Sequence, residues 1–391
     1  MSQRFSSRTN WDLGESSFAQ SIRVARATGK TLLDLTVSNP TACGFQYDAC
    51  VILDPLSSTQ ALSYDPDPRG MLSAREAVAA YYADHNASIS PEAVNLTTST
   101  SEAYGYLFRL LCNAGDEILV PQPSYPLFDY LADLEDVRLQ PYPLFYDYGW
   151  WIDFALLESR ITPRTRAILL VHPNNPTGHA TARAEREKLE EICQRHNLSL
   201  IVDEVFLDYP HGAAQQLESP TRLESFATGP HPALTFVLSG MSKIAGLPQM
   251  KVGWIVSLGP DPLRHEALAR LEVIADTFLS MNAPAQLALP SWLTSRKVIQ
   301  DQIIARLAKN LQTIDASPIE RLLSDGGWSA ILRLPYIGVG AEQLLSLPGV
   351  IVHPGSFYGM AETAAERIVI SLITPSAEFS IGIERIVKVS K

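Results

Sequence analysis

The segment LSGMSKIAGLPQMKVGW (Leu238–Trp254) places a lysine, Lys243, just after the apolar run LTFVLS (234–239). Small residues surround this lysine, and a second one, Lys251, follows eight positions later. An apolar run unbroken by polar residues predicts a strand that is covered on both faces. A lysine at the end of such a strand is either a solvated charge or an amine held for chemistry.

Four further runs have the same character. They are EILV (117–120), AILLVH (167–172), LSLIVDE (198–204) and VGWIVS (252–257). Between the runs lie segments with apolar residues near helical spacing, such as Ser101–Cys112 and Ala182–His196. Buried strands that alternate with helices predict an α/β domain built around a mostly parallel sheet.

The pattern changes after about Leu263. Long helical stretches come first, including Lys297–Ile314. The runs WSAILRL (328–334), GVIVH (349–353) and RIVISLI (367–373) follow and have the character of strands. This order of elements predicts a second, smaller α+β unit near the C-terminus.

The N-terminal part of the chain is expected to join that smaller unit. Phe18–Gly29 has apolar residues on one helical face and a glycine at its end, which indicates an amphipathic helix. We therefore expect residues 1–50 to contribute to a small domain, residues 51–284 to form a large domain, and residues 285–391 to complete the small one.

Composition narrows the class of protein. Hydrophobic residues make up 46% and charged residues 19% of the 391 residues, as in folded globular chains. The net charge of −11 argues against nucleic acid or an anionic membrane as a partner, and no apolar stretch has membrane-spanning length. Cys43, Cys50, Cys112 and Cys193 form no CxxC pair, so we expect no metal site and no disulfide framework, and a cytoplasmic location.

Polar groups follow several of the predicted strands. HPNNPTG (172–178) follows one run, Asp203 closes the next, Lys243 follows a third, and TTSTSEAY (97–104) opens a helix. Each has an ordinary interpretation: a surface turn, a helix N-cap, a solvated charge and a capping box. Ligands of open α/β sheets bind beyond the carboxyl ends of the strands, so the joint placement of these groups indicates a ligand site.

In this order and spacing, the NNPTG turn (174–178), the DEVF segment (203–206) and the SK…G…KVGW segment resemble the pyridoxal-phosphate-dependent aminotransferases of class I/II. The resemblance extends from LDLTVSNPT (33–41) to RIVISLITP (367–375). It implies fold type I, the architecture of the aspartate aminotransferase superfamily. In that fold, helices sandwich the mostly parallel sheet of a large domain, and a smaller α+β domain is built from both termini.

The resemblance also implies roles around the cofactor ring. Lys243 would form a Schiff base with the cofactor aldehyde, because only a primary amine gives an imine that a substrate amine can displace. The same amine would then shuttle a proton. Asp203 would keep the pyridine nitrogen protonated, which makes the ring an electron sink. Asn175 would donate to the ring 3′-oxygen, and Tyr125 would stack on the ring face.

Other residues would hold the cofactor phosphate. Ser99, Thr100 and Ser101 would bind it at a helix N-terminus, where backbone N–H groups and the helix dipole favour an anion. Ser242 would join them. Tyr64, in YDPDPRG, matches a tyrosine that reaches the phosphate of the neighbouring subunit, which implies a homodimer with its sites at the subunit interface.

Three cofactor positions depart from the family pattern. Phe206 stands where a tyrosine usually donates to the ring oxygen, and it has no donor. Lys251 replaces an arginine that binds phosphate, so the charge remains but the bidentate fork is lost. Gly240 stands where a serine is often found, three residues before the lysine.

A fourth departure concerns the substrate. Val369 stands where the family has the arginine that binds the substrate α-carboxylate. Either the substrate lacks this carboxylate or another arginine supplies the charge. Arg367 is one candidate, because strand residues two apart share a face, and Arg333 is another. The resemblance further implies substrate contacts from Ser38 and Asn39.

The function expected from these features is transfer of an amino group between an amino donor and a 2-oxo acid, by way of Lys243 and pyridoxamine phosphate. Other reactions of the same carbanion remain open, including β-elimination such as C–S cleavage, decarboxylation and racemisation. A non-catalytic, pyridoxal-phosphate-binding regulator is a further alternative. Such regulators carry a winged helix ahead of this fold, whereas LDLTVSNPT already begins at Leu33.

Overall fold

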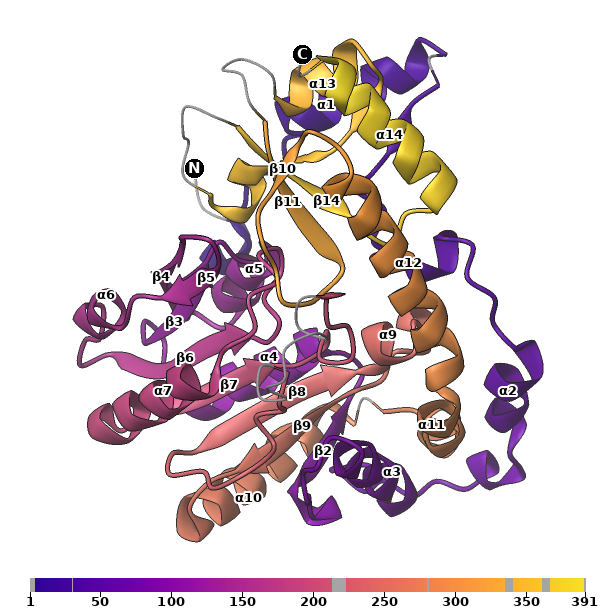
Figure 1. Ribbon diagram of the computed structural model, residues 1–391. Coiled ribbons are helices and arrows are strands. Elements are labelled where there is room, and N and C mark those ends of the chain that lie inside the picture. Colours follow the sequence, from indigo (N-terminus) through magenta and orange to yellow (C-terminus); the bar gives the residue numbers. More distant parts are fainter. Residues whose placement is uncertain are drawn as a thin grey trace.

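The computed structural model describes residues 4–29, 31–212, 223–279, 281–334, 340–360 and 366–389. Its largest element is an eight-stranded sheet of order β2-β9-β8-β7-β6-β3-β4-β5 (Figure 1). Its strands are β2 Val94–Thr97, β3 Glu117–Gln122, β4 Arg138–Tyr146, β5 Trp150–Ile152, β6 Thr165–Val171, β7 Ser199–Asp203, β8 Thr235–Gly240 and β9 Gly253–Leu258. Strands β8, β7, β6, β3 and β4 are parallel to one another.

The predicted mostly parallel sheet is confirmed, and all five apolar runs form strands. The run at β9 pairs antiparallel with both β8 and β2, and β5 pairs antiparallel with β4. Strands β2, β4 and β5 were not predicted. Strand β4 lies near the sheet edge, carries two prolines and is only partly buried, so its sequence RLQPYPLFY is not a continuous apolar run.

The helices are as follows. They are α1 Ser17–Ala27, α2 Ala49–Leu53, α3 Leu72–Ala83, α4 Thr100–Leu111, α5 Leu127–Leu134, α6 Phe154–Ser159, α7 Arg183–His196, α9 Met241–Ile244, α10 Asp261–Phe278, α11 Ala283–Ser295, α12 Lys297–Asp315, α13 Ala341–Ser346 and α14 Ser376–Val389. The predictions for α1, α4, α7 and α12 are confirmed to within two residues at each end. No helix in the described segments is long and apolar enough to cross a membrane.

Helices cover both faces of the large sheet. Alternate residues of β7 enter two separate cores: Ile201 packs in the core that includes α4, α5 and α10, whereas Leu200 and Val202 pack in the core that includes α3 and α7. Because strand side chains alternate between faces, the unbroken apolar sequence of β7 follows from burial on both sides.

A smaller antiparallel sheet of order β10-β11-β14-β13 lies beside α12 (Figure 1). Its strands are β10 Glu320–Arg321, β11 Ser329–Arg333, β13 His353–Pro354 and β14 Arg367–Ser371. Strand β1 (Leu33–Asp34) pairs parallel with β12 (Val350–Ile351), so the N-terminal part of the chain does pack with the C-terminal part. The domain boundaries expected after residues 50 and 284 fall inside α2 and α11, and the division stays a prediction.

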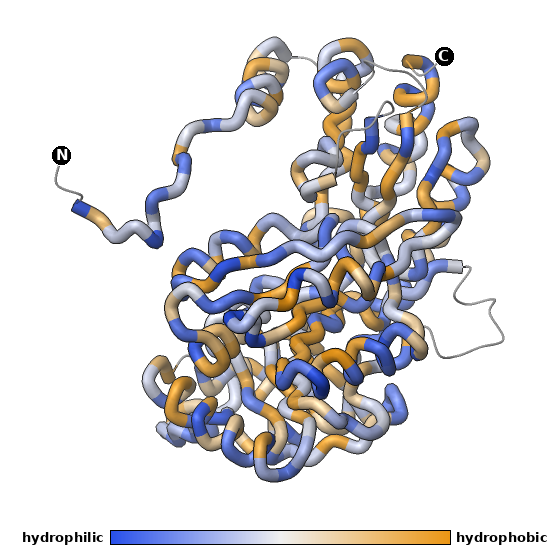
Figure 2. The backbone as a smooth tube through the Cα atoms, turned by 90° about the vertical axis from the view of Figure 1, so that its left-hand side faces the viewer, coloured by the Kyte–Doolittle hydropathy of each residue, from blue (hydrophilic) through white to orange (hydrophobic). Residues whose placement is uncertain are grey.

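The N-terminal segment ahead of α1 extends away from the body of the molecule (Figure 2). It is attached to the C-terminal half of α5 and the turn that follows it. Arg8 forms an ion pair with Asp136, and the indole N–H of Trp11 donates to Asp133 at 2.8 Å. The Trp11 ring also packs edge-on against Tyr130.

Strand β9 approaches the start of α4 closely at Gly253. A Cβ atom on Gly253 would lie 2.9 Å from the carbonyl carbon of Ser99 and 3.1 Å from the backbone nitrogen of Thr100. Gly240 on β8 is similarly confined, because a Cβ atom there would lie 2.8 Å from the carbonyl oxygen of Val252. This contact gives a physical reason for a glycine at position 240.

We expect Gly253→Ala to lower the free energy of unfolding by about 1–3 kcal/mol, because the added methyl meets backbone that cannot move without shifting α4. Chemical denaturation of the protein measures this change. Gly105→Ala on α4 is the matched control, since its methyl would lie 3.7 Å from Glu135 Oε1, and it should be neutral or stabilise by about 0.4–1 kcal/mol. Equal stability of the two variants would contradict the close approach.

Candidate active site

A cavity of about 530 Å³ lies between the carboxyl ends of β6 and β7 and the four-stranded sheet. The large sheet contributes Val171 and Asp203, which are register partners at the ends of β6 and β7. The smaller sheet contributes Ser329 of β11 and Val369 of β14. This is the edge at which an open α/β sheet binds its ligands.

Most residues singled out from the sequence line this one cavity. They are Ser38, Ser99, Thr100, Ser101, Tyr125, Asn175, Asp203, Phe206, Ser242, Lys243 and Lys251. Residues that are far apart in the sequence are therefore brought together, as their common position after strands indicated.

Lys243 is held in place through the backbone of its loop. It lies on α9, a single turn directly after β8. The Tyr209 hydroxyl donates to the carbonyl of Lys243 at 2.5 Å, and the Gln300 amide donates to the carbonyl of Ile244 at 2.8 Å. The carbonyl of Lys243 also accepts the N–H of Gly246 at 3.3 Å, so side chains and backbone together hold the end of this short helix. The Nζ atom of Lys243 lies 4.8 Å from the centroid of the Trp328 ring.

Asp203 is almost fully buried and accepts two hydrogen bonds. The backbone N–H of Val205 donates to Oδ1 at 3.0 Å, and the hydroxyl of Tyr104 donates to Oδ2 at 2.8 Å. Burial raises the pKa of Asp203 to about 6, against these two donors and the charge of Lys243, which lower it. Desolvation lowers the pKa of Lys243 to about 8, and Asp203 opposes that change.

The start of α4 lines one end of the cavity. The Ser99 hydroxyl accepts the N–H of Glu102 at 3.1 Å, which confirms the expected N-cap. The Glu102 carboxylate accepts from the N–H of Thr98 at 2.7 Å rather than from that of Ser99. The first-turn N–H groups, Ser242 and Lys251 supply further donors and a positive charge at the cavity.

The NNPTG turn presents Asn175 to the cavity. Its conformation is fixed from within, because the Asn174 side chain accepts from the hydroxyl of Thr177 at 2.9 Å, and its carbonyl accepts from the N–H of Gly178 at 2.7 Å. The hydroxyl of Ser329 donates to Oδ1 of Asn175 at 3.4 Å, so this contact joins the turn to the smaller sheet.

Three predicted substrate residues do not line the cavity. Asn39 caps a short helical turn, with Oδ1 accepting from the N–H of Thr41 at 3.1 Å. Arg333 pairs with Glu320 at 2.8 Å on the neighbouring strand. Arg367 lies opposite Arg333 in the sheet register, and its position at the start of β14 leaves its guanidinium outside the lining. The expectation that Arg367 or Arg333 faces the substrate is not supported.

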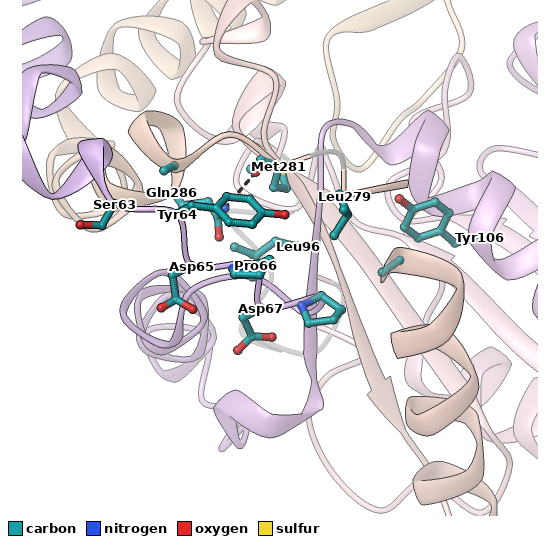
Figure 3. Close-up of a pocket in the computed structure, with 14 residues that line it drawn as sticks. Ser63, Tyr64, Asp65, Pro66, Asp67, Leu96, Tyr106, Leu279, Met281 and Gln286 are labelled. Atoms are coloured by element: carbon teal, nitrogen blue, oxygen red, sulfur yellow. Dashed lines mark hydrogen bonds between the residues drawn. The ribbon is translucent and has the colours of Figure 1, made fainter. Parts of the chain in front are cut away.

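Tyr64 also lies outside this cavity. Its side chain is 81% exposed and lines a separate small pocket of about 90 Å³, together with Leu96, Leu279 and Gln286 (Figure 3). Gln286 is oriented there by its amide, which donates to the carbonyl of Met281 at 3.2 Å. Tyr64 is thus available to a second chain rather than to the cavity of its own chain.

Several residues that line the cavity were not predicted from the sequence. Tyr104 belongs to TTSTSEAY and Trp328 opens WSAILRL, but neither motif indicated a side chain that faces a ligand. His353 is the register partner of Val369, and its ring stacks on Phe357 with centroids 5.2 Å apart. Burial lowers the pKa of His353. The wall formed by the smaller sheet therefore combines the apolar Val369 and Ile370 with the polar side chains of Ser329, His353 and Ser371.

The donor set fits pyridoxal phosphate. The cavity offers hydroxyl and N–H donors for a phosphate, a buried carboxylate for a pyridinium, and a primary amine of lowered pKa for an aldehyde. The close approach of Gly253 to Ser99 leaves no side chain between β9 and the start of α4. Within the described segments, no group of three or more His, Cys, Asp or Glu side chains is arranged to hold a metal ion.

Comparisons with known proteins agree with this donor set. Residues 9–381 match the family described as aminotransferase class I and II. Glutamate-pyruvate aminotransferase AlaA of Escherichia coli K12 is 29% identical over 276 residues, which cover 70% of this chain and 66% of that enzyme. Alanine aminotransferase of Mycobacterium tuberculosis is 28% identical over 280 residues, which cover 71% of this chain and 64% of that enzyme. These matches span just under two thirds of the relatives' own lengths.

Solved structures show the same fold. Alanine aminotransferase from Pyrococcus furiosus superposes with a TM-score of 0.84 at 22% identity, and the match covers 99% of each chain. A tyrosine aminotransferase from Leishmania infantum superposes with a TM-score of 0.81 at 22% identity, covering 97% of this chain and 98% of that one. The expected fold type I architecture is confirmed.

The lowered pKa of Lys243 can be tested in the protein without cofactor. Its rate of modification by a small amine-reactive reagent should rise with pH through a midpoint near about 8, because only the neutral amine reacts. In Asp203→Asn the midpoint should move lower, since the carboxylate that favours the ammonium is gone. Mass spectrometry of the peptide measures the rate, with the exposed Lys309 as internal reference. An unchanged midpoint in Asp203→Asn would show that the charge of Asp203 does not affect the pKa of Lys243.

Proposed function

The chain belongs to the class I and II aminotransferases, a family of pyridoxal-phosphate-dependent enzymes that transfer amino groups, and from that membership we propose that it moves an amino group between an amino donor and a 2-oxo acid. The observation that carries the proposal is the presence of Lys243 and Asp203 in one cavity, at the ends of adjacent parallel strands. The fold and the anion donors at the start of α4 support it.

Lys243 acts as the base in the proposed reaction. When bound, the cofactor supplies an electron sink that weakens the Cα–H bond of the substrate. The Nζ atom of Lys243 accepts the proton that leaves Cα and returns it later. A base whose pKa lies near the working pH is suited to both steps, and desolvation brings the amine to about 8.

The other polar residues of the cavity are proposed to bind and orient the cofactor. Asp203 holds a proton on the ring nitrogen, and Asn175 donates to the ring oxygen. Ser99, Thr100 and Ser101 bind the phosphate with Ser242 and Lys251, and Tyr125 covers the ring. Phe206 offers no hydroxyl at the ring oxygen, and its ring packs edge-on against Trp328.

The proposed assembly is a homodimer, and the proposed location is the cytoplasm. The exposed Tyr64 supports the dimer, because it lies at the surface and outside the cavity of its own chain, where a second copy could contact it. All four cysteines are free thiols, which supports a reducing compartment. The proposed substrates are an amino acid or amine and a 2-oxo acid, in keeping with the glutamate-pyruvate and alanine aminotransferases among the relatives.

Transamination is tested against other carbanion reactions by half-reactions. The holoenzyme is offered a panel of amino acids and amines, and the visible absorbance of the bound cofactor is followed. Transamination converts the cofactor once per substrate and is reversed by a 2-oxo acid. A β-lyase or a decarboxylase instead keeps the absorbance and releases ammonia or carbon dioxide continuously, and that outcome would replace the proposed activity.

We expect Lys243→Ala to keep its fold and to bind the cofactor noncovalently, yet to lose turnover by at least about a thousandfold, the scale for removing a general base together with covalent attachment. Borohydride should no longer fix the cofactor to the chain. Lys309→Ala changes an exposed lysine and is the control. Near wild-type activity together with a reducible cofactor bond would contradict the role of Lys243.

We expect Arg367→Leu to leave both half-reactions within about twofold of wild type, because its guanidinium does not line the cavity. The half-reactions with an amino acid and with the corresponding simple amine measure this. A loss confined to the amino acid would instead assign the carboxylate contact to Arg367, after a rearrangement of β14. Arg333→Leu serves as the matched control on the neighbouring strand, since Arg333 is paired with Glu320.

A further inference from the structure

The side chain of Asp203 accepts a hydrogen bond from Tyr104, which lies on α4, far from the DEVF segment and from β7. We propose, on the basis of the proposed function, that Tyr104 is a positioning residue whose hydroxyl keeps Asp203 ionised and oriented, so that a proton resides on the ring nitrogen of the cofactor. Tyr104 would act only through Asp203 and would not touch the reacting atoms.

The geometry fixes the Tyr104 hydroxyl on the carboxylate. Tyr104 lies on the second turn of α4, is 3% exposed, and donates to Oδ2 of Asp203 at 2.8 Å, a normal distance for an O–H···O bond. Its ring packs edge-on against Phe128, with centroids 5.1 Å apart, and also against Phe108. A ring confined on two sides cannot turn its hydroxyl toward a different acceptor.

The direction of this hydrogen bond follows from burial. Burial raises the pKa of Tyr104 well above its usual value, and the charge of Asp203 raises it further, so Tyr104 keeps its proton and donates it. A donor to a carboxylate stabilises the charged form. Tyr104 and the N–H of Val205 therefore oppose the burial that favours a protonated Asp203.

The titratable groups around Asp203 do not provide a constant charge that would keep its carboxylate ionised, so the hydrogen-bond donors do. Lys243 lowers the pKa of Asp203 only while it carries a charge, and the proposed reaction requires its neutral amine. The charge of Asp203 contributes to the raised pKa values of Tyr125 and Tyr82, and both phenols stay neutral. The hydrogen bonds from Tyr104 and Val205 do not change with the state of Lys243.

The location of the shared proton decides the chemistry. One proton between Asp203 and a pyridine nitrogen resides either on the nitrogen, as an ion pair, or on the carboxyl, as a neutral pair. Donors to the carboxylate favour the ion pair, and only the protonated ring withdraws electrons strongly. The Tyr104 hydroxyl, as a donor to Asp203, would favour the ion pair.

Tyr104→Phe tests the proposal because it removes the hydroxyl and keeps the ring. In the protein without cofactor, the carboxyl of Asp203, followed by isotope-edited NMR, should titrate roughly one to two pH units higher, the scale of a hydrogen bond to a charged group. In the holoenzyme with ¹⁵N-labelled pyridoxal phosphate, the ring nitrogen signal should move toward its unprotonated value. Turnover should fall roughly ten- to a hundredfold.

Tyr142→Phe is the matched control. Tyr142 is also fully buried in the large sheet, and its hydroxyl donates to the carbonyl of Leu169 at 3.1 Å, away from Asp203. It should change stability by an amount similar to Tyr104→Phe and leave the carboxyl titration and the nitrogen signal unchanged. A 3-fluorotyrosine at position 104, whose more acidic phenol donates more strongly, should lower the midpoint and thus move it in the opposite direction.

The proposal and the proposed function fail in different ways. If Tyr104→Phe keeps the wild-type carboxyl midpoint and nitrogen signal, Tyr104 is only a core residue and the proposal is overturned. If Asp203→Asn keeps full activity, the role of Asp203 itself is wrong, whatever Tyr104 does. Opposite shifts of the midpoint for phenylalanine and fluorotyrosine at position 104 would support the positioning role.

Discussion

The central constraint on this site is that a carboxylate, Asp203, and a primary amine, Lys243, share one desolvated cavity. Burial pushes Asp203 and Lys243 toward their neutral forms, to pKa values of about 6 and about 8, while their mutual attraction opposes both changes. The charged form of either group needs hydrogen-bonding or charged partners in the cavity, because an unpaired buried charge costs several kcal/mol. The fold provides those partners from elements that meet only at this edge of the sheet.

The partners come from the backbone as much as from side chains. Asp203 ends β7, and the N–H of Val205 turns back onto its carboxylate. The loop that carries Lys243 is held by Tyr209 and Gln300 through carbonyls, so the amine itself stays available. The start of α4 is seated against Gly253, which places first-turn N–H groups at the cavity and, one turn later, Tyr104 on Asp203. One helix thus serves both the anion end and the carboxylate.

The sequence predicted those parts of the site that follow directly from local pattern. Continuous apolar runs marked β6, β7 and β8, and polar residues at their ends marked the cavity, because parallel strands end at one edge. The bond from Tyr104 to Asp203 joins residues 99 positions apart and depends on how α4 packs, which no local pattern encodes. The position of Arg367 outside the cavity lining likewise depends on tertiary packing.

Arg367 shares a strand face with Val369, yet only Val369 is among the residues that line the cavity. The register sets Arg367 opposite Arg333, and Arg333 is already paired with Glu320 on the next strand. Only the pairing of three strands reveals this arrangement, and pairing between separated segments is set by tertiary packing. The partial burial of β4 and the antiparallel direction of β9 escaped prediction for the same reason.

Val369, which the family resemblance places at the position of a carboxylate-binding arginine, lies in a closely packed part of the smaller sheet. Val369 pairs with Ile331 on one side and with His353 on the other, and its own side chain is 1% exposed. A charge at this position would be buried, and burial of a charge is costly unless a close partner offsets it. Burial also lowers the pKa of His353 and favours its neutral ring, which can donate a hydrogen bond but carries no fixed charge. Within the described residues, the smaller sheet thus presents apolar surface and hydrogen-bonding side chains to the cavity, and no guanidinium.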